Sequence, residues 1–122
     1  MTATDHAVEL TRAAARAAGE KLAERMIAFD VSDQLFITDV FLICSAGNDR
    51  QVRAIVDAVE ERLLQMDAKP VRREGQQEGR WVLLDYADLV VHVQHQDERE
   101  FYALERLWSD CPVVELPTAD ER

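Results

Sequence analysis

The 122-residue chain is poor in lysine: only Lys21 and Lys69 are present, and 24 acidic residues outnumber 14 basic ones. A protein that recognises a nucleic acid through its phosphates needs clustered lysine and arginine. The formal charge of -10 therefore argues against direct binding of DNA or RNA, and we expect no nucleic-acid specificity. The same charge draws an acidic protein toward basic surfaces.

Cysteine is also scarce. Cys44 and Cys111 do not form a Cys-x-x-Cys pair, and no cluster of histidine and cysteine has the spacing of a zinc site. Cys44 lies inside the apolar run of residues 40–44, where a buried and unreactive thiol is expected. This cysteine usage fits a reducing cytosol, and we expect neither a metal nor another cofactor.

Long apolar segments are missing from the sequence. No stretch approaches the roughly 18 apolar residues that a membrane-spanning helix requires, and residues 1–18 lack the apolar centre of a secretion signal. We therefore expect a cytoplasmic protein without a membrane partner. Apolar residues nonetheless make up 48% of the chain, which is enough for the core of one domain.

The spacing of the apolar residues predicts three helices and five strands. The predicted helices cover about 4–25, 48–66 and 97–108, and the predicted strands cover 27–31, 36–45, 71–74, 81–85 and 89–93. A strand-helix-strand order around the second helix predicts a parallel crossover, while a tight hairpin at 81–93 makes the sheet mixed. We predict one α/β domain over residues 1–112, with helices packed on the sheet, and an acidic, flexible tail over 113–122.

The predicted hairpin has two different faces, because side chains alternate along a strand. The purely aliphatic positions of both arms should lie beneath the helices. The opposite face carries Trp81, Leu83, Val90 and His92, a mixture that is typical of an interaction surface with aromatic anchors. A helix that covers this face as well would make Trp81 a core residue. We favour a partly open face, since the first helix is too rich in alanine to shield much.

Polar residues near the hairpin allow a catalytic alternative. His92 and His95 form a His-x-x-His pair, but positions i and i+3 of a strand point to opposite faces, which favours a structural or interface histidine. Asp85 and Asp88 flank a turn, where aspartate is common without any catalytic role. Paired carboxylates could also hold Mg²⁺ in a nucleotidyltransferase-like enzyme, although no Asp-x-Asp follows Ser45. We therefore predict no catalytic residues.

Arg50 is the remaining candidate for partner binding. It lies in the first turn of the second predicted helix, where a cation meets the positive end of the helix dipole. A locally unfavourable cation is either simply solvated or retained for an outside partner, and the sequence leaves both readings open.

Three sequence blocks, in the same order, resemble the ribosomal silencing factor (Iojap) family. They are residues 37–52 (ITDVFLICSAGNDRQV), residues 74–75 with 81–93 (EG and WVLLDYADLVVHV), and residues 99–108 (REFYALERLW). The chain departs from the family pattern at Ala46 and at Ala87, where a threonine and a glycine are usual. Both replacements are small, and neither weakens the resemblance.

The resemblance implies a fold similar to that of nucleotidyltransferases but without their catalytic residues. It implies a non-enzymatic protein that binds the fourteenth protein of the large ribosomal subunit, blocks joining of the small subunit and represses translation when nutrients are scarce. A basic ribosomal protein is a suitable partner for an acidic chain. Family members also self-associate, so a homodimer is a further expectation. Carried over by position, the contact residues are Trp81, Leu83, Asp85, Tyr86, Asp88, His92 and, as a weaker candidate, Arg50.

Overall fold

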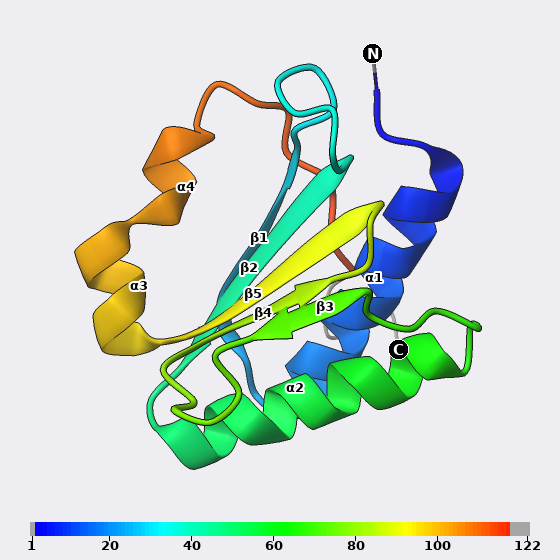
Figure 1. Ribbon diagram of the computed structural model, residues 1–122. Helices are drawn as coiled ribbons and strands as arrows, with labels where there is room; N and C mark the ends of the chain where they lie inside the picture. Colours follow the sequence, from blue (N-terminus) through cyan, green and yellow to red (C-terminus); the bar gives the residue numbers. More distant parts are fainter. Residues whose placement is uncertain (1, 118–122) are drawn as a thin grey trace.

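A computed structural model describes residues 2–117 as a five-stranded sheet with helices on both faces (Figure 1). The elements are α1 (Asp5–Glu20), β1 (Glu24–Asp30), β2 (Val40–Ala46), α2 (Asp49–Leu64), β3 (Arg72–Glu74), β4 (Trp81–Asp85), β5 (Leu89–His95), α3 (Gln96–Tyr102) and α4 (Leu104–Leu107). None of the helices within the described range is long and apolar enough to cross a membrane.

The strand order is β1-β2-β5-β4-β3, and the predicted mixed sheet is confirmed. β2 and β5 are the parallel pair, while β1–β2, β4–β5 and β3–β4 are antiparallel. The turn between β4 and β5 is too short for anything but an antiparallel hairpin, whereas β2 and β5 are separated by the long α2 crossover. The two central strands therefore run parallel and are covered on both faces.

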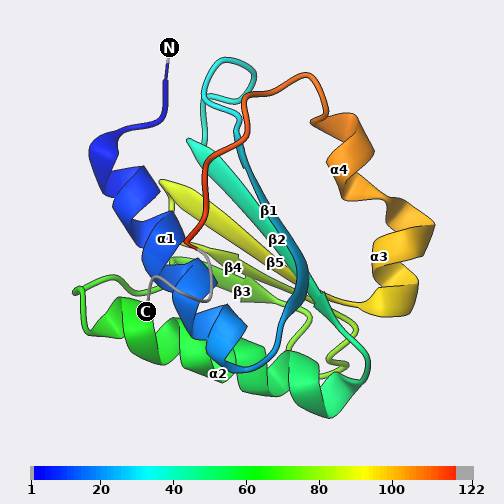
Figure 2. The ribbon, with the colours of Figure 1, turned by 180° about the vertical axis from the view of Figure 1, so that it is seen from behind.

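α1 and α2 pack against each other and against one face of the sheet (Figure 2). The predicted aliphatic positions of the hairpin lie in this core: Val82, Leu84, Leu89, Val91 and Val93 are buried there. α1 contributes mainly alanines, whose small side chains let the helix lie close to its neighbours, and six of them are buried. The expectation that this alanine-rich helix shields little of the sheet is wrong. Because its side chains are small, α1 packs close to its neighbours and buries its own alanines in the core.

The opposite face is covered by the short α3 and α4 with Trp108, which we call the α3–α4 arm (residues 96–108), and Leu35 and Cys111 also pack on this side. The sequence predicts one continuous helix here, but the structure breaks it at Ala103, whose φ of 46° is left-handed. Leu104 at the start of α4 and Trp108 directly after it pack against a small second core that contains Ile43 and Phe29. Two short helices cover less area than one long helix, so this face stays partly open.

Two predicted element boundaries are corrected. The strand predicted over 36–45 begins only at Val40, because pairing with β5 starts at Leu89, and the preceding Phe36 is 97% exposed in a loop. The first helix ends at Glu20 rather than near Arg25, since Leu22 has a left-handed φ of 64° that stops it.

The segment after α4 returns to the sheet. The backbone of Val113 bridges Phe29 on the outer side of β1, and the amide of Val114 donates to the carbonyl of Ala28 at 2.8 Å (Figure 2). Leu116 packs against the main core. Val113, Val114 and Leu116 of the predicted tail thus contact the domain, and residues 118–122 lie outside the described range.

We predict that Gly75→Ala destabilises the protein by about 2 kcal/mol, because Gly75 has a left-handed φ of 83° and an added Cβ would lie 2.0 Å from the carbonyl oxygen of Trp81. Gly47→Ala is the matched control, since nothing lies within 4 Å of its added Cβ. Urea unfolding of both variants measures the difference. Equal stabilities would show that the loop after β3 adapts without strain.

Candidate functional site

Six rings contact one another in a line across the partly open face, and we call this line the aromatic row. The centroid distances from one end to the other are 4.9, 4.9, 6.1, 5.1 and 5.2 Å. In order, the members are Phe101, Tyr102, Trp81, His92, Phe41 and Trp108. The row joins α3 and Trp108, the residue directly after α4, to three neighbouring strands.

Strand register places the three central rings together. Trp81 pairs with Gln94 on β5, Phe41 pairs with Val90 on β5, and His92 lies between these two positions. The three side chains share one face because residues two apart along a strand point the same way. Diagonal neighbours on adjacent strands are within reach of aromatic side chains. The alternation of the hairpin thus accounts for the middle of the row.

His92 is the buried centre of the row. Only 5% of the residue is exposed, so the expectation that it faces solvent is wrong. Its ring lies between those of Trp81 and Phe41, and its Nδ1 accepts a hydrogen bond of 3.2 Å from the indole N–H of Trp81. Burial lowers the pKa of His92 to about 4, so the ring is neutral near pH 7.

The neutral ring has a fixed tautomer. Because Nδ1 accepts from Trp81, Nε2 of His92 carries the proton, and this N–H is buried without a hydrogen-bond partner among the described residues. A ring that orients Trp81 and carries no charge suits a structural position within an interface. It is poorly suited to metal binding, since its accepting nitrogen is already engaged.

Leu83 and Asp85 lie on the same face, toward the hairpin turn, and both are half-buried. One carboxylate oxygen of Asp85 accepts from the amide of Ala87 at 2.9 Å, and the other lies 3.8 Å from the guanidinium of Arg72. Asp88 is exposed in the turn, and its carbonyl accepts from the amide of Val40. The two aspartates therefore shape the turn that borders the face.

Tyr86, which the resemblance carries over as a contact residue, lies on the inner face of the hairpin. It continues the inward alternation of Val82 and Leu84, so its ring lies in the core beneath α1 and α2 and is only 6% exposed. Its hydroxyl is buried near Glu60 and Arg73, and burial raises the pKa of Tyr86 to about 12. The ring of Tyr86 is therefore part of the main core and not of the aromatic row.

Arg50 is exposed at the start of α2, away from the aromatic row. It borders a shallow hollow with the end of α1, which includes Lys21 and Leu22. None of the residues that line this hollow comes from β4, β5 or the arm. The hollow that Arg50 borders is therefore distinct from the aromatic row.

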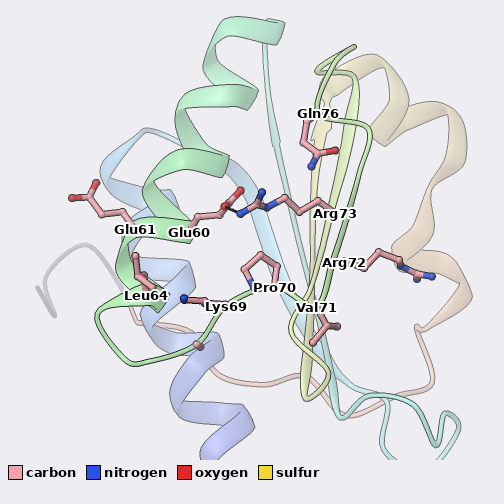
Figure 3. Close-up of a pocket in the computed structure, with 10 residues that line it drawn as sticks. Glu60, Glu61, Leu64, Lys69, Pro70, Val71, Arg72, Arg73 and Gln76 are labelled. Atoms are coloured by element: carbon pink, nitrogen blue, oxygen red, sulfur yellow. Dashed lines mark ion pairs between the residues drawn. The ribbon is translucent and has the colours of Figure 1, made fainter.

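A hollow that the prediction did not single out lies elsewhere, between α2 and the edge strand β3 (Figure 3). It measures about 720 Å³, and the ion pair between Arg73 and Glu60, 2.8 Å long, crosses one end of it. Leu64 lines it from α2. No predicted site residue reaches this hollow, so the candidate site is a face and not a pocket.

The sequence prediction assigned no residue of the α3–α4 arm to the partly open face. The prediction treated residues 97–108 as one helix and did not assign Phe41, Tyr102 or Trp108 to this face. Phe41 could have been found from strand alternation, because it shares parity with Ile43 on the second face. The positions of Tyr102 and Trp108 depend on the break at Ala103, for which the sequence offers no glycine or proline signal.

This arrangement can bind but offers little for catalysis. Tyr102 is 51% exposed and Phe101 is 81% exposed, so one end of the row projects to solvent while His92 anchors its middle. Large rings on a rigid sheet are typical anchors of protein interfaces. Among residues 2–117, no group of three or more histidine, cysteine or acidic side chains is arranged to hold a metal.

Comparison with known proteins gives consistent matches. Residues 4–122 match the model of the family described as ribosomal silencing factor during starvation (RsfS). The ribosomal silencing factors of Halalkalibacterium halodurans and Bacillus subtilis are 42% and 40% identical; each alignment covers 88% of this chain, and 92% and 91% of those proteins. A crystal structure of a Bacillus halodurans protein matches with a TM-score of 0.78 at 40% identity, covering 88% of this chain and 98% of that one.

We predict that stability falls as the pH drops from about 6.5 to 4. The folded pKa of His92, about 4, lies below its usual value of 6.5, so the unfolded chain takes up the proton first. The stabilisation is complete above 6.5, and its loss by pH 4 approaches about 3 kcal/mol.

Urea unfolding between pH 4 and 7 measures this slope. His92→Asn keeps an acceptor for Trp81 but removes the titration, so its slope should be shallower by the same amount. His6→Asn changes an exposed histidine and should keep the original slope. An unchanged slope in His92→Asn would mean that other groups cause the pH dependence.

Proposed function

The chain belongs to the family of ribosomal silencing factors, and we propose that it represses translation by binding the large ribosomal subunit when nutrients are limiting. The proposed contact is the fourteenth protein of that subunit, and the proposed surface is the aromatic row with Leu83. The protein would occupy the position that the small subunit needs. The half-exposed aromatic row is the observation that carries the proposal.

The aromatic row supports this role because it combines exposure with rigidity. Trp81 is half-buried between Tyr102 and His92, and its indole N–H is held by the histidine. An anchor whose rotamer is fixed before binding loses little entropy when the partner docks. Leu83 adds an aliphatic contact beside it. Such central, pre-positioned groups carry most of the binding energy in protein interfaces.

Charge supports a basic protein as the partner. The chain carries a formal charge of -10, and Glu74, Asp85 and Asp88 lie along the hairpin side of the face. Acidic groups at the rim speed the encounter with a basic ribosomal protein and oppose contact with ribosomal RNA. The interaction should therefore weaken as the salt concentration rises.

The mechanism needs only steric exclusion. When two ligands compete for one site, the fraction that is blocked depends on the affinity and concentration of the blocker. A contact of roughly 800 Å² per partner is sufficient for a specific complex. No bond is made or broken in this mechanism, so we infer a regulator that acts by binding and not by catalysis.

We predict that Trp81→Ala weakens binding to purified large subunits by about 2 kcal/mol or more, as the loss of a central anchor does. Leu83→Ala should weaken binding by a smaller amount. The measurement is cosedimentation through a sucrose gradient, combined with a subunit-joining assay in which both variants silence less than the wild type.

Leu64→Ala is the matched control, because Leu64 is 52% exposed on α2, away from the aromatic row. It should sediment with large subunits as the wild type does. Light scattering of the same samples tests whether the protein self-associates and whether Trp81→Ala changes this. Normal cosedimentation of Trp81→Ala would place the ribosomal contact on another surface.

A further inference from the structure

Arg99 is one of the most deeply buried charged residues in the described structure, with 2% of its surface exposed. Its Nε donates to the carboxylate of Glu105, its Nη2 donates to the carbonyl of Arg25 at 2.6 Å, and its Nη1 lies 3.4 Å from the hydroxyl of Ser45. One guanidinium thus joins α3, α4, β1 and β2. Arginine is rarely buried to this extent unless such partners are provided.

The ion pair between Arg99 and Glu105 requires the break in the arm. Residues six apart in a continuous α-helix are separated by about 9 Å along the axis and point in different directions. The left-handed Ala103, with a φ of 46°, turns the chain between them and brings Glu105 back to the guanidinium. The same break sends Tyr102 toward β4 and Trp108 toward β2.

A second distortion meets the same guanidinium from the sheet. The pairing of β1 with β2 shifts register between Glu24 and Ile27, and Arg25 within this bulge has a left-handed φ of 53°. The carbonyl of Arg25 accepts the 2.6 Å bond from Arg99. Two non-glycine residues in a strained conformation thus flank one buried contact, a pattern that is typical of sites where geometry serves function.

We propose that Arg99 and Glu105 are positioning residues for the aromatic row. Their ion pair holds the α3–α4 arm on the sheet, so that Tyr102 supports Trp81 and Trp108 supports Phe41 in the geometry that the partner meets. This inference rests on the proposed function, because it assigns the arm a role in ribosome binding. Neither residue contacts the partner in this account.

The arm is separate enough from the main core for the two roles to be distinguished. The core beneath α1 and α2 contains no buried residue of α3 or α4. The arm is attached through Arg99, the aromatic contacts, the small second core around Ile43, and the exposed ion pairs of Arg80 with Asp97 and Glu98. Loosening the ion pair should therefore release the arm while α2 keeps its packing.

The test is Glu105→Gln in the full chain, with Glu100→Gln as the matched control. Glu105→Gln keeps the shape of the side chain but leaves the buried guanidinium without a counter-charge. Glu100 is exposed on the same arm. Amide hydrogen exchange of α3–α4 and of α2 is measured together with binding to purified large subunits. Arg99→Lys is the second variant, which retains the charge but loses the planar fork.

We expect Glu105→Gln and Arg99→Lys to speed exchange in the arm, to leave exchange in α2 unchanged, and to weaken binding by about tenfold, as displacement of an anchor does. Glu100→Gln should match the wild type in all three measurements. Faster arm exchange with unchanged binding would overturn the positioning role. Faster exchange in α2 to the same extent would also overturn it, since the ion pair would then stabilise the whole domain.

Failure of the proposed function has a different signature. If the wild-type protein does not bind large subunits, the proposed function and the positioning role both fall, and the wild-type sample alone reveals it. If the wild type binds and neither variant alters exchange in the arm or binding, only the positioning role is overturned. The two results are therefore distinguishable in one experiment.

Discussion

The parallel pairing of β2 with β5 is the constraint on which the rest of the structure depends. These strands are central in the sheet and apolar on both sides, so each face needs a cover. α1 and α2 together cover one face, and the α3–α4 arm is left to cover the other. Because the arm is short and broken, the aromatic row lies between core and surface.

This partial cover gives the second face properties that neither a core nor an ordinary surface has. His92 is buried deeply enough to stay neutral, yet its neighbour Trp81 is only half-buried and Tyr102 is 51% exposed. The buried His92 at the centre of the row holds the neighbouring Trp81 in place. The side chains of such an interface are held in position before the partner binds. The buried guanidinium of Arg99 holds the α3–α4 arm on the sheet in the same way.

Local patterns were sufficient for some elements and not for others. The hairpin was predicted with its β4 boundaries intact, because alternation and a tight turn are local features. Tyr86 was read as a turn residue, whereas its ring continues the inward alternation of Val82 and Leu84 into the core. The break at Ala103 was missed because no glycine or proline marks it, and the contacts of Arg99 with Arg25 and Ser45 that accompany it join segments far apart in the chain.

The sequence by itself determined the α/β class, the mixed sheet, the aliphatic face of the hairpin and the family, since each follows from periodicity, turn residues or ordered motifs. Only the tertiary structure decided which rings meet, how deeply His92 is buried and where the arm lies. The physical reason is the separation along the chain of the residues that make each contact. Periodicity reports how neighbouring residues face, whereas the aromatic row and the Arg99 contacts join segments far apart in the chain, as Arg99 and Arg25 are.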